Sequence, residues 1–274
     1  MARSNLIFEA LKNAWKGVSK NKLLVVLIIV LNLTFLILWF GNSLFFQERV
    51  TEGLINITET LDNDLPTDDE ITQGIFSGQS LVSDGFVESM EIYESILKDL
   101  RMWIIISGIL FALIGGLYWS FTNSLFEDGK FFNYYSRFII VSIVYFLIII
   151  GIFQLVIINA GFKAESSSYI FFIALLVIGY FMPITNSLLG NMKLKKVVKK
   201  TLEIAFGKLP WIILMYLLCG IMIGLPLYLI VLLNSVVDNV FVMIISGLIM
   251  LLVMTYVRAF IMSLVNQASS ELSS

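Results

Sequence analysis

The chain has 274 residues, of which 58% are apolar and only 14% are charged, and its formal net charge is −2. Soluble domains carry about 45–50% apolar and about 25% charged residues, so this composition excludes a soluble globular domain and favours a multi-span membrane protein. There is no histidine and a single cysteine, Cys219. Histidine-based catalysis, histidine metal sites and an intrachain disulfide are therefore excluded.

Residues 1–22 predict an amphipathic helix ahead of the first apolar segment. Apolar residues recur at helical spacing from Ile7 to Val18, whereas Lys12, Lys16 and Lys20 follow each other four residues apart on another face. Such a helix either lies in the lipid interface, with its lysines toward anionic headgroups, or packs on the protein's own bundle. The segment after it lacks the small-residue cleavage site of a signal peptide.

Six segments are long and apolar enough to cross a bilayer, which takes about 20 residues. They are 23–46, 102–126, 138–159, 169–189, 209–233 and 240–265. The polar segments between and beyond them are 47–101, 127–137, 160–168, 190–208, 234–239 and 266–274. The apolar runs are continuous, which excludes the alternating pattern of a membrane β-barrel. The predicted fold class is all-α, with six transmembrane helices.

Lysine and arginine are distributed unevenly between the two sides of the predicted membrane. One side carries 14 of the 18 basic residues and five acidic residues, whereas the other carries four basic and 15 acidic residues. The two sides thus have net charges of +9 and −11. Because basic loops remain in the cytoplasm, both termini are predicted to be cytoplasmic and 47–101 extracytoplasmic, in the plasma membrane.

Segment 47–101 predicts an extracytoplasmic helical hairpin. One apolar stripe continues outward from the first span, through Val50, Leu54, Ile57 and Leu61. A second stripe begins after a helix N-cap at Asp84 and leads into the second span, through Phe86, Met90, Tyr93, Leu97 and Leu100. The stripes are expected to pack on each other, and a helix from 84 to 101 would project about 27 Å.

Two features of this hairpin suggest modification or ion binding. Asn56 begins an Asn-Ile-Thr sequon and is a candidate for glycosylation, whereas the sequon at Asn32 lies within the first span and is expected to stay unmodified. Acidic residues are dense between Asp62 and Glu70, but Pro66 and a missing glycine break the pattern of a calcium loop. A solvated acidic tip is favoured over a calcium site.

An internal repeat is indicated at the cytoplasmic ends of two spans. Thr122-Asn123-Ser124 closes the second span and Thr185-Asn186-Ser187 closes the fourth, and basic segments 130–137 and 193–208 follow. The pattern predicts three parallel units, each an interfacial helix followed by a membrane hairpin; coincidence among apolar helices is the alternative. Many secondary transporters have inverted rather than parallel repeats.

The lead Ala-Leu-Lys-Asn-Ala-Trp-Lys at 10–16, followed by a hairpin and used three times, resembles a broad group of uncharacterised six-span prokaryotic, archaeal-like membrane proteins. That group includes the membrane domain attached to some glycerophosphodiester phosphodiesterases. The resemblance implies a fold but no chemistry, because the catalytic domain of that enzyme has no counterpart here. The large outer loop also departs from the compact pattern of the group.

Three features at or within the membrane are candidate sites. Gly220 and Gly224 form a GxxxG element that suits helix packing, with a gate as the alternative. Arg258 is the only ionisable residue within the spans. Its charge either snorkels to headgroups or pairs with an acid at the cytoplasmic edge, namely Glu127, Asp128 or Glu203. A cationic cluster predicted to bind anionic lipid follows the fourth span: Lys193, Lys195, Lys196, Lys199 and Lys200.

Catalysis is disfavoured, because no cofactor, metal or nucleophile motif is found; a Ser–Lys or carboxylate site stays open. Two functions remain. The first is a non-catalytic scaffold or accessory protein that binds a protein partner, or oligomerises, through its outer hairpin and binds anionic lipid through its basic helices. The alternative is a membrane-spanning transport subunit with a separate ATPase. A polar cavity among the third, fifth and sixth spans would favour transport, and no nucleic-acid partner is expected.

Overall fold

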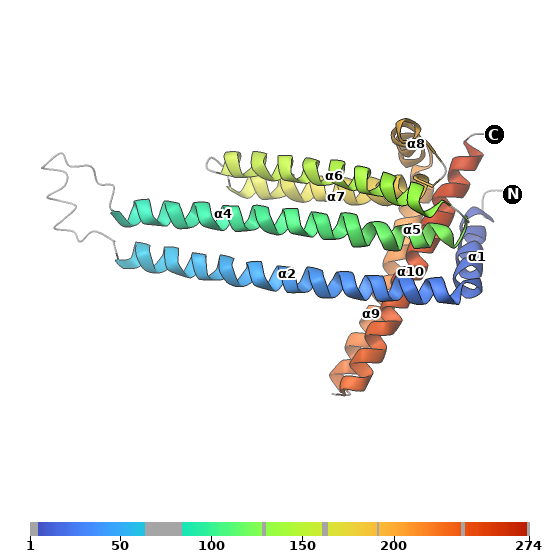
Figure 1. The fold of residues 1–274 in the computed structure, drawn as a ribbon, viewed down its shortest axis with the longest axis horizontal. Helices are drawn as coiled ribbons and strands as arrows, with labels where there is room; N and C mark the ends of the chain where they lie inside the picture. Colours follow the sequence, from blue (N-terminus) through green and yellow to red (C-terminus); the bar gives the residue numbers. More distant parts are fainter. Residues whose placement is uncertain are drawn as a thin grey trace, which may run out of the picture. The chain divides into compact units, whose positions relative to one another are not determined.

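The computed structural model describes residues 5–63, 84–127, 130–160, 164–190, 192–236 and 239–272, and every element in these ranges is a helix. Six helical segments are long and apolar enough to cross a membrane: Lys22–Thr60, Val87–Ser124, Phe131–Val156, Tyr169–Leu188, Leu209–Leu233 and Val240–Glu271. The all-α class with six candidate spans is thus confirmed, and the protein is a multi-pass helical membrane protein (Figure 1).

The elements in chain order are α1 (Asn5–Lys20), α2 (Lys22–Asn63), α4 (Asp84–Leu110), the π-helix η1 (Phe111–Gly115), α5 (Gly116–Ser124), α6 (Phe131–Ala160), α7 (Ala164–Leu188), α8 (Leu194–Gly207), α9 (Leu209–Val236) and α10 (Val240–Glu271). They form two compact units. The hairpin unit is Ile37–Ile109, and the bundle unit joins Met1–Leu36 to Leu110–Ser274.

The hairpin unit consists of the outer part of α2 and most of α4, which run side by side (Figure 1). Trp103 Nε1 donates a hydrogen bond to Ser43 Oγ over 3.2 Å, and Arg49 Nε lies 3.2 Å from Asp99 Oδ2. The closest approach is at Gly53, where an added Cβ would lie 2.7 Å from Ile96 Cγ1. Glycine therefore allows the close approach here, since a side chain at this position would have to displace Ile96.

Both arms of the predicted outer hairpin are helical and continuous with the spans, as expected from the apolar stripes. The acidic tip from Asp64 to Glu70 lies outside the described residues. The face of α4 that packs against α2 is rotated by about one residue from the predicted face. Ser89, Ile96 and Asp99 are buried, whereas Met90 and Tyr93, which were predicted to make the contact, are exposed. The close contact at Gly53 and the ion pair of Asp99 together hold α4 in this rotation.

In the bundle unit, α1 packs on the C-terminal half of α10. Ala10 and Ala14 of α1 are buried, and Tyr256 Oη donates to Leu11 O over 3.1 Å. Helices α6 and α7 form an antiparallel pair, and α8 packs on α7. The end of α8 meets the end of α10, where Lys208 Nζ lies 2.8 Å from Glu271 Oε2. Helix α1, the end of α8 and the end of α10 were all predicted to lie on the cytoplasmic side of the membrane. The structure brings these three segments into contact within the bundle unit.

Two boundaries differ from the predictions. Separate lead helices precede the first and third hairpins, as α1 and α8, but residues 131–137 are the first turns of α6. No glycine or proline separates these turns from the span, and Arg137 Nη1 donates to the carbonyls of Leu189 and Met192 over 2.9 and 2.7 Å. The prediction of a lead helix for every hairpin is wrong for the second. The predicted tail 266–274 is likewise helical as far as Glu271.

The Thr-Asn-Ser repeat has the same local structure at both of its positions. Thr122 and Thr185 each donate to the carbonyl four residues earlier, over 2.7 and 2.9 Å. Both asparagines are buried, and Gly190 allows the end of α7 to approach Asn123, because an added Cβ would lie 2.5 Å from Asn123 Oδ1. The two span ends are thus built alike and pack at one end of the bundle unit.

Candidate functional site

Arg258, on α10, lies against a hydrogen-bonded polar pair inside the bundle unit. Its Nη2 donates to Asn32 Oδ1 of α2 over 2.9 Å, and Asn32 Nδ2 lies 3.5 Å from Thr255 Oγ1. Thr255 in turn donates to Leu251 O over 2.9 Å. Asn32 is 6% exposed, so these bonds are shielded from competing water.

Two aromatic rings of α5 cover the Arg258 guanidinium. Its carbon Cζ lies 3.9 Å from the ring centroid of Tyr118 and 5.7 Å from that of Trp119. Both rings are within the range in which a cation is attracted by the negative face of an aromatic ring. Neutral groups from α2 and α5 therefore stabilise the charge carried by α10.

The groups that contact Arg258 in the structure are not those that were predicted. Its Nη1 is buried without a hydrogen-bond partner among the described residues, and snorkelling to headgroups stays a prediction. Of the predicted acidic partners, Glu127 pairs with Lys130 over 2.7 Å, and Glu203 lies 3.5 Å from Lys200. Asp128 lies outside the described residues. The amide of Asn32 and the rings of α5 occupy the place that was predicted for a carboxylate.

Tyr118 and Trp119 are not predicted from the sequence, and Asn32 is predicted only as a buried sequon. An asparagine within an apolar span was a usable signal, because a buried amide needs a hydrogen-bond partner. The rings gave no such signal, because the π-helix η1 sits directly before them and shifts the register of α5 by one residue relative to an uninterrupted α-helix.

The predicted cationic cluster lies on α8 and its N-cap. Lys193, Lys195, Lys196 and Lys199 are exposed, whereas the Lys200 side chain is only 11% exposed. Three faces can be distinguished around this helix. One face is buried against the bundle unit and includes Val197, Thr201, Ile204 and Ala205. A second is an exposed apolar stripe of Val198, Leu202 and Phe206, and the third is charged.

Helix α1 has the same three kinds of face. Its buried face includes Leu6, Ala10, Ala14 and Gly17. Phe8 and Trp15 are 68% and 65% exposed, and Trp15 contacts the edge of Tyr256 with ring centroids 6.3 Å apart. Lys12, Lys16 and Lys20 are exposed. Helices α1 and α8 thus both present apolar and basic side chains at the surface.

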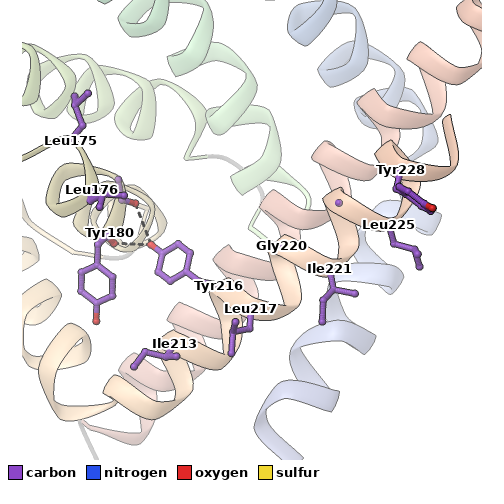
Figure 2. A pocket seen from close by; sticks show the side chains of 12 residues that line it. Leu175, Leu176, Tyr180, Ile213, Tyr216, Leu217, Gly220, Ile221, Leu225 and Tyr228 are labelled. Atoms are coloured by element: carbon purple, nitrogen blue, oxygen red, sulfur yellow. Dashed lines mark hydrogen bonds between the residues drawn. The ribbon is translucent and has the colours of Figure 1, made fainter. Parts of the chain in front are cut away.

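Gly220 and Gly224 do not pack against another helix in the part of the chain that the structure describes. A Cβ added at either would meet nothing within 4 Å, and both line an open apolar groove of about 1000 Å³ between α7 and α9 (Figure 2). The two helices touch at one end of this groove, where Tyr216 Oη donates to Tyr180 O over 2.7 Å. The predicted packing role is therefore not realised between helices of this chain.

Asn56 is exposed on α2 in the hairpin unit, and its glycosylation stays a prediction. Among the described residues, no group of three His, Cys, Asp or Glu side chains lies close enough to hold a metal ion.

Comparisons of the chain with protein-family models, with curated proteins and with solved structures find no match. The resemblance to six-span prokaryotic membrane proteins therefore stays a prediction.

Proposed function

We propose that the protein is a non-catalytic adaptor of the plasma membrane that holds a protein partner on its extracytoplasmic hairpin unit. The observation that carries this proposal is a set of large apolar side chains exposed on the hairpin outside the predicted membrane boundary. Leu54 and Ile55 on α2 and Val87, Met90 and Tyr93 on α4 are between 42% and 53% exposed. Large apolar side chains left exposed to water on a two-helix segment favour an interaction surface.

The charges around this surface indicate the chemistry of the partner. Carboxylates flank the apolar residues on both helices, at Glu52 and Glu59 on α2 and at Glu88, Glu91 and Glu94 on α4. A partner with an apolar centre and a basic rim would complement them, and the charges would speed its association. Self-association through the same surface is disfavoured because it would bring carboxylates together.

The faces of α1 and α8 support a second contact, with lipid. A helix that has protein on one side, an exposed apolar stripe on the next and lysines on the third suits the boundary between protein, hydrocarbon and water. We infer that both helices lie at the cytoplasmic surface with their lysines on anionic headgroups. Each lysine near such a surface contributes about 1 kcal/mol.

Site-specific photo-crosslinking tests the adaptor proposal. A photoreactive residue at Met90 should crosslink one defined protein in native membranes, whereas the same residue at the membrane-facing Val30 should not. Reversing charge with Glu91→Lys and Glu94→Lys should lower the yield from Met90 several-fold. Equal yields from Met90 and Val30, or no effect of charge reversal, would contradict the proposal.

The same experiment separates the adaptor from a transport subunit. Both described grooves in the spans are lined mainly by apolar side chains, which suits acyl chains better than a polar solute. The photoreactive residue can also be placed at Lys12 or Lys196. Crosslinks from these positions to an ATPase, with none from Met90, would favour transport instead.

A further inference from the structure

A second groove lies between α6 and α7 and ends beneath the basic helix α8. Its volume is about 490 Å³, within the range of about 300–1,000 Å³ that is usual for ligand pockets. Val144 and Ile148 of α6 and Val177 and Phe181 of α7 line its walls, and Leu194 and Val198 of α8 line its cytoplasmic end. These wall residues belong to the apolar spans, so the groove opens at membrane depth.

The polar groups in the groove are already paired with each other. Tyr145 Oη and Thr185 Oγ1 lie 2.9 Å apart, and Thr201 Oγ1 lies 3.4 Å from Thr185 Oγ1. The hydroxyl groups thus satisfy one another, and the remaining lining is aliphatic or aromatic. A hydrocarbon chain fits such a lining without leaving a polar group unsatisfied.

The cytoplasmic end of the groove carries positive charge. Lys195 and Lys199 follow each other four residues apart on α8, beside the exposed stripe of Val198 and Leu202. The Lys199 side chain is 84% exposed and lies 3.9 Å from Glu203, so its ammonium group remains accessible. Leu194 and Val198, which line this end of the groove, directly precede Lys195 and Lys199 in the sequence. An apolar groove with two lysines on the helix at its end complements a molecule with an acyl chain and an anionic phosphate.

The larger groove between α7 and α9 lacks this arrangement among its described lining residues. None of its twelve lining residues, which come from α7 and α9, is charged (Figure 2). Bulk lipid would fill that groove without selection for a headgroup. The two grooves therefore provide an internal comparison, because they share apolar walls and differ in charge at the cytoplasmic end.

We propose that the groove between α6, α7 and α8 holds one anionic phospholipid, with an acyl chain along Val144 and Phe181 and its phosphate on Lys195 and Lys199. This rests on the lipid contact proposed for α8 and narrows it to one site and one lipid class. The bound lipid fastens the cytoplasmic helix α8 to the α6–α7 hairpin.

Native mass spectrometry of the full-length protein in detergent tests this, with phosphatidylglycerol and phosphatidylcholine of identical acyl chains added in turn. We expect one retained phosphatidylglycerol, preferred over phosphatidylcholine by roughly tenfold. The double variant Lys195→Gln/Lys199→Gln should bring this preference to within about twofold. The matched variant Lys12→Gln/Lys16→Gln removes the same charge from α1; it should weaken general attraction of anionic lipid to α1 but still retain one phosphatidylglycerol in preference to phosphatidylcholine.

A second pair of variants tests the acyl chain. Val144→Trp fills the groove and should lower retention of both lipids, and the smaller change Val144→Phe should do so in part. Leu217→Trp places the same bulk in the groove between α7 and α9, at a residue of similar exposure, and should leave retention of phosphatidylglycerol unchanged.

Several results would overturn the inference. Equal retention of the two lipids by the wild type would remove headgroup selection, and unchanged retention by both Val144 variants would place the acyl chain elsewhere. Equal losses in the α1 and α8 lysine variants would indicate general attraction to anionic lipid. In that last case the lipid contact proposed for both helices stands, and only the single site fails. Crosslinking at Met90 reports on the adaptor proposal independently.

Discussion

The Arg258 guanidinium is stabilised without a described carboxylate. A hydrogen bond to a charged group contributes about 1.5–3 kcal/mol, and a desolvated cation over an aromatic ring about 2 kcal/mol. The contacts to Asn32 and to the rings of Tyr118 and Trp119 together offset part of the cost of removing the charge from water. Because these groups come from α2, α5 and α10, Arg258 links the first and third membrane hairpins.

Replacing Arg258 should therefore weaken the bundle unit. We expect Arg258→Ala to lower the free energy of unfolding by about 2–4 kcal/mol, since it removes the ring contact and leaves the Asn32 amide oxygen unpaired. Arg258→Lys should lose less, because it keeps the charge but not the planar face. Cys219 is a free, buried thiol, so a thiol-reactive dye measures the unfolding temperature.

Lys199→Ala is the control for this measurement, because that side chain is 84% exposed and its loss should change stability by less than about 0.5 kcal/mol. An unfolding temperature of Arg258→Ala equal to that of the wild type would show that the cluster contributes nothing to stability.

At the scale of elements, the hairpin unit depends on one glycine. Gly53 and Gly41 both lie on α2 within this unit, but only Gly53 is in close contact with α4. We expect Gly53→Leu to separate the helices and cost about 1–3 kcal/mol, as overpacked contacts do. Amide hydrogen exchange in the α4 segment 88–100 should then increase. Gly41→Leu meets open space and should leave this exchange unchanged; equal effects of both changes would contradict the described contact.

The environment of α1 can be tested with a dye that reports polarity. In a Cys219→Ser background, a dye at Trp15→Cys should have a blue-shifted emission and be quenched by nitroxide lipids labelled near the headgroup, because position 15 lies on the exposed apolar face. A dye at Asn13→Cys, on the polar face, should be quenched by iodide in water instead. If iodide quenched both dyes equally, α1 would not lie in the interface.

The spans and the arms of the outer hairpin were predictable from the sequence, because apolar length and helical spacing are local properties. The rotation of α4 was not, since it depends on the contact of Gly53 with Ile96, which lies 43 residues further along the chain. From the sequence, Arg258 could be recognised only as an unexpected charge in an apolar span, and its contacts could not be predicted. Its partners come from helices far apart in the sequence, and one of these helices follows a π-helical turn.

At the scale of the whole molecule, the unequal distribution of charge predicts a single orientation. In a Cys219→Ser background, a membrane-impermeant maleimide should label Glu91→Cys in intact cells but label Lys196→Cys only after permeabilisation. Both positions are exposed in the structure, so access depends on the side of the membrane. Labelling of Lys196→Cys in intact cells would contradict the proposed topology and with it the extracytoplasmic adaptor.

The π-helical turn η1 also has a consequence for how this chain tolerates change in length. A turn that holds one extra residue can lose it and close into an ordinary α-helix, so a one-residue deletion at Leu113 would leave span two intact. Side chains beyond the turn would keep their orientation, because the π-turn already holds the one residue that is removed. A one-residue deletion in the regular α-helix before the turn would instead rotate every later side chain by about 100° relative to those before it. Deletions at the two places would thus separate the crossing itself from the aromatic cover of Arg258, since only the second moves Tyr118 and Trp119 away from the guanidinium.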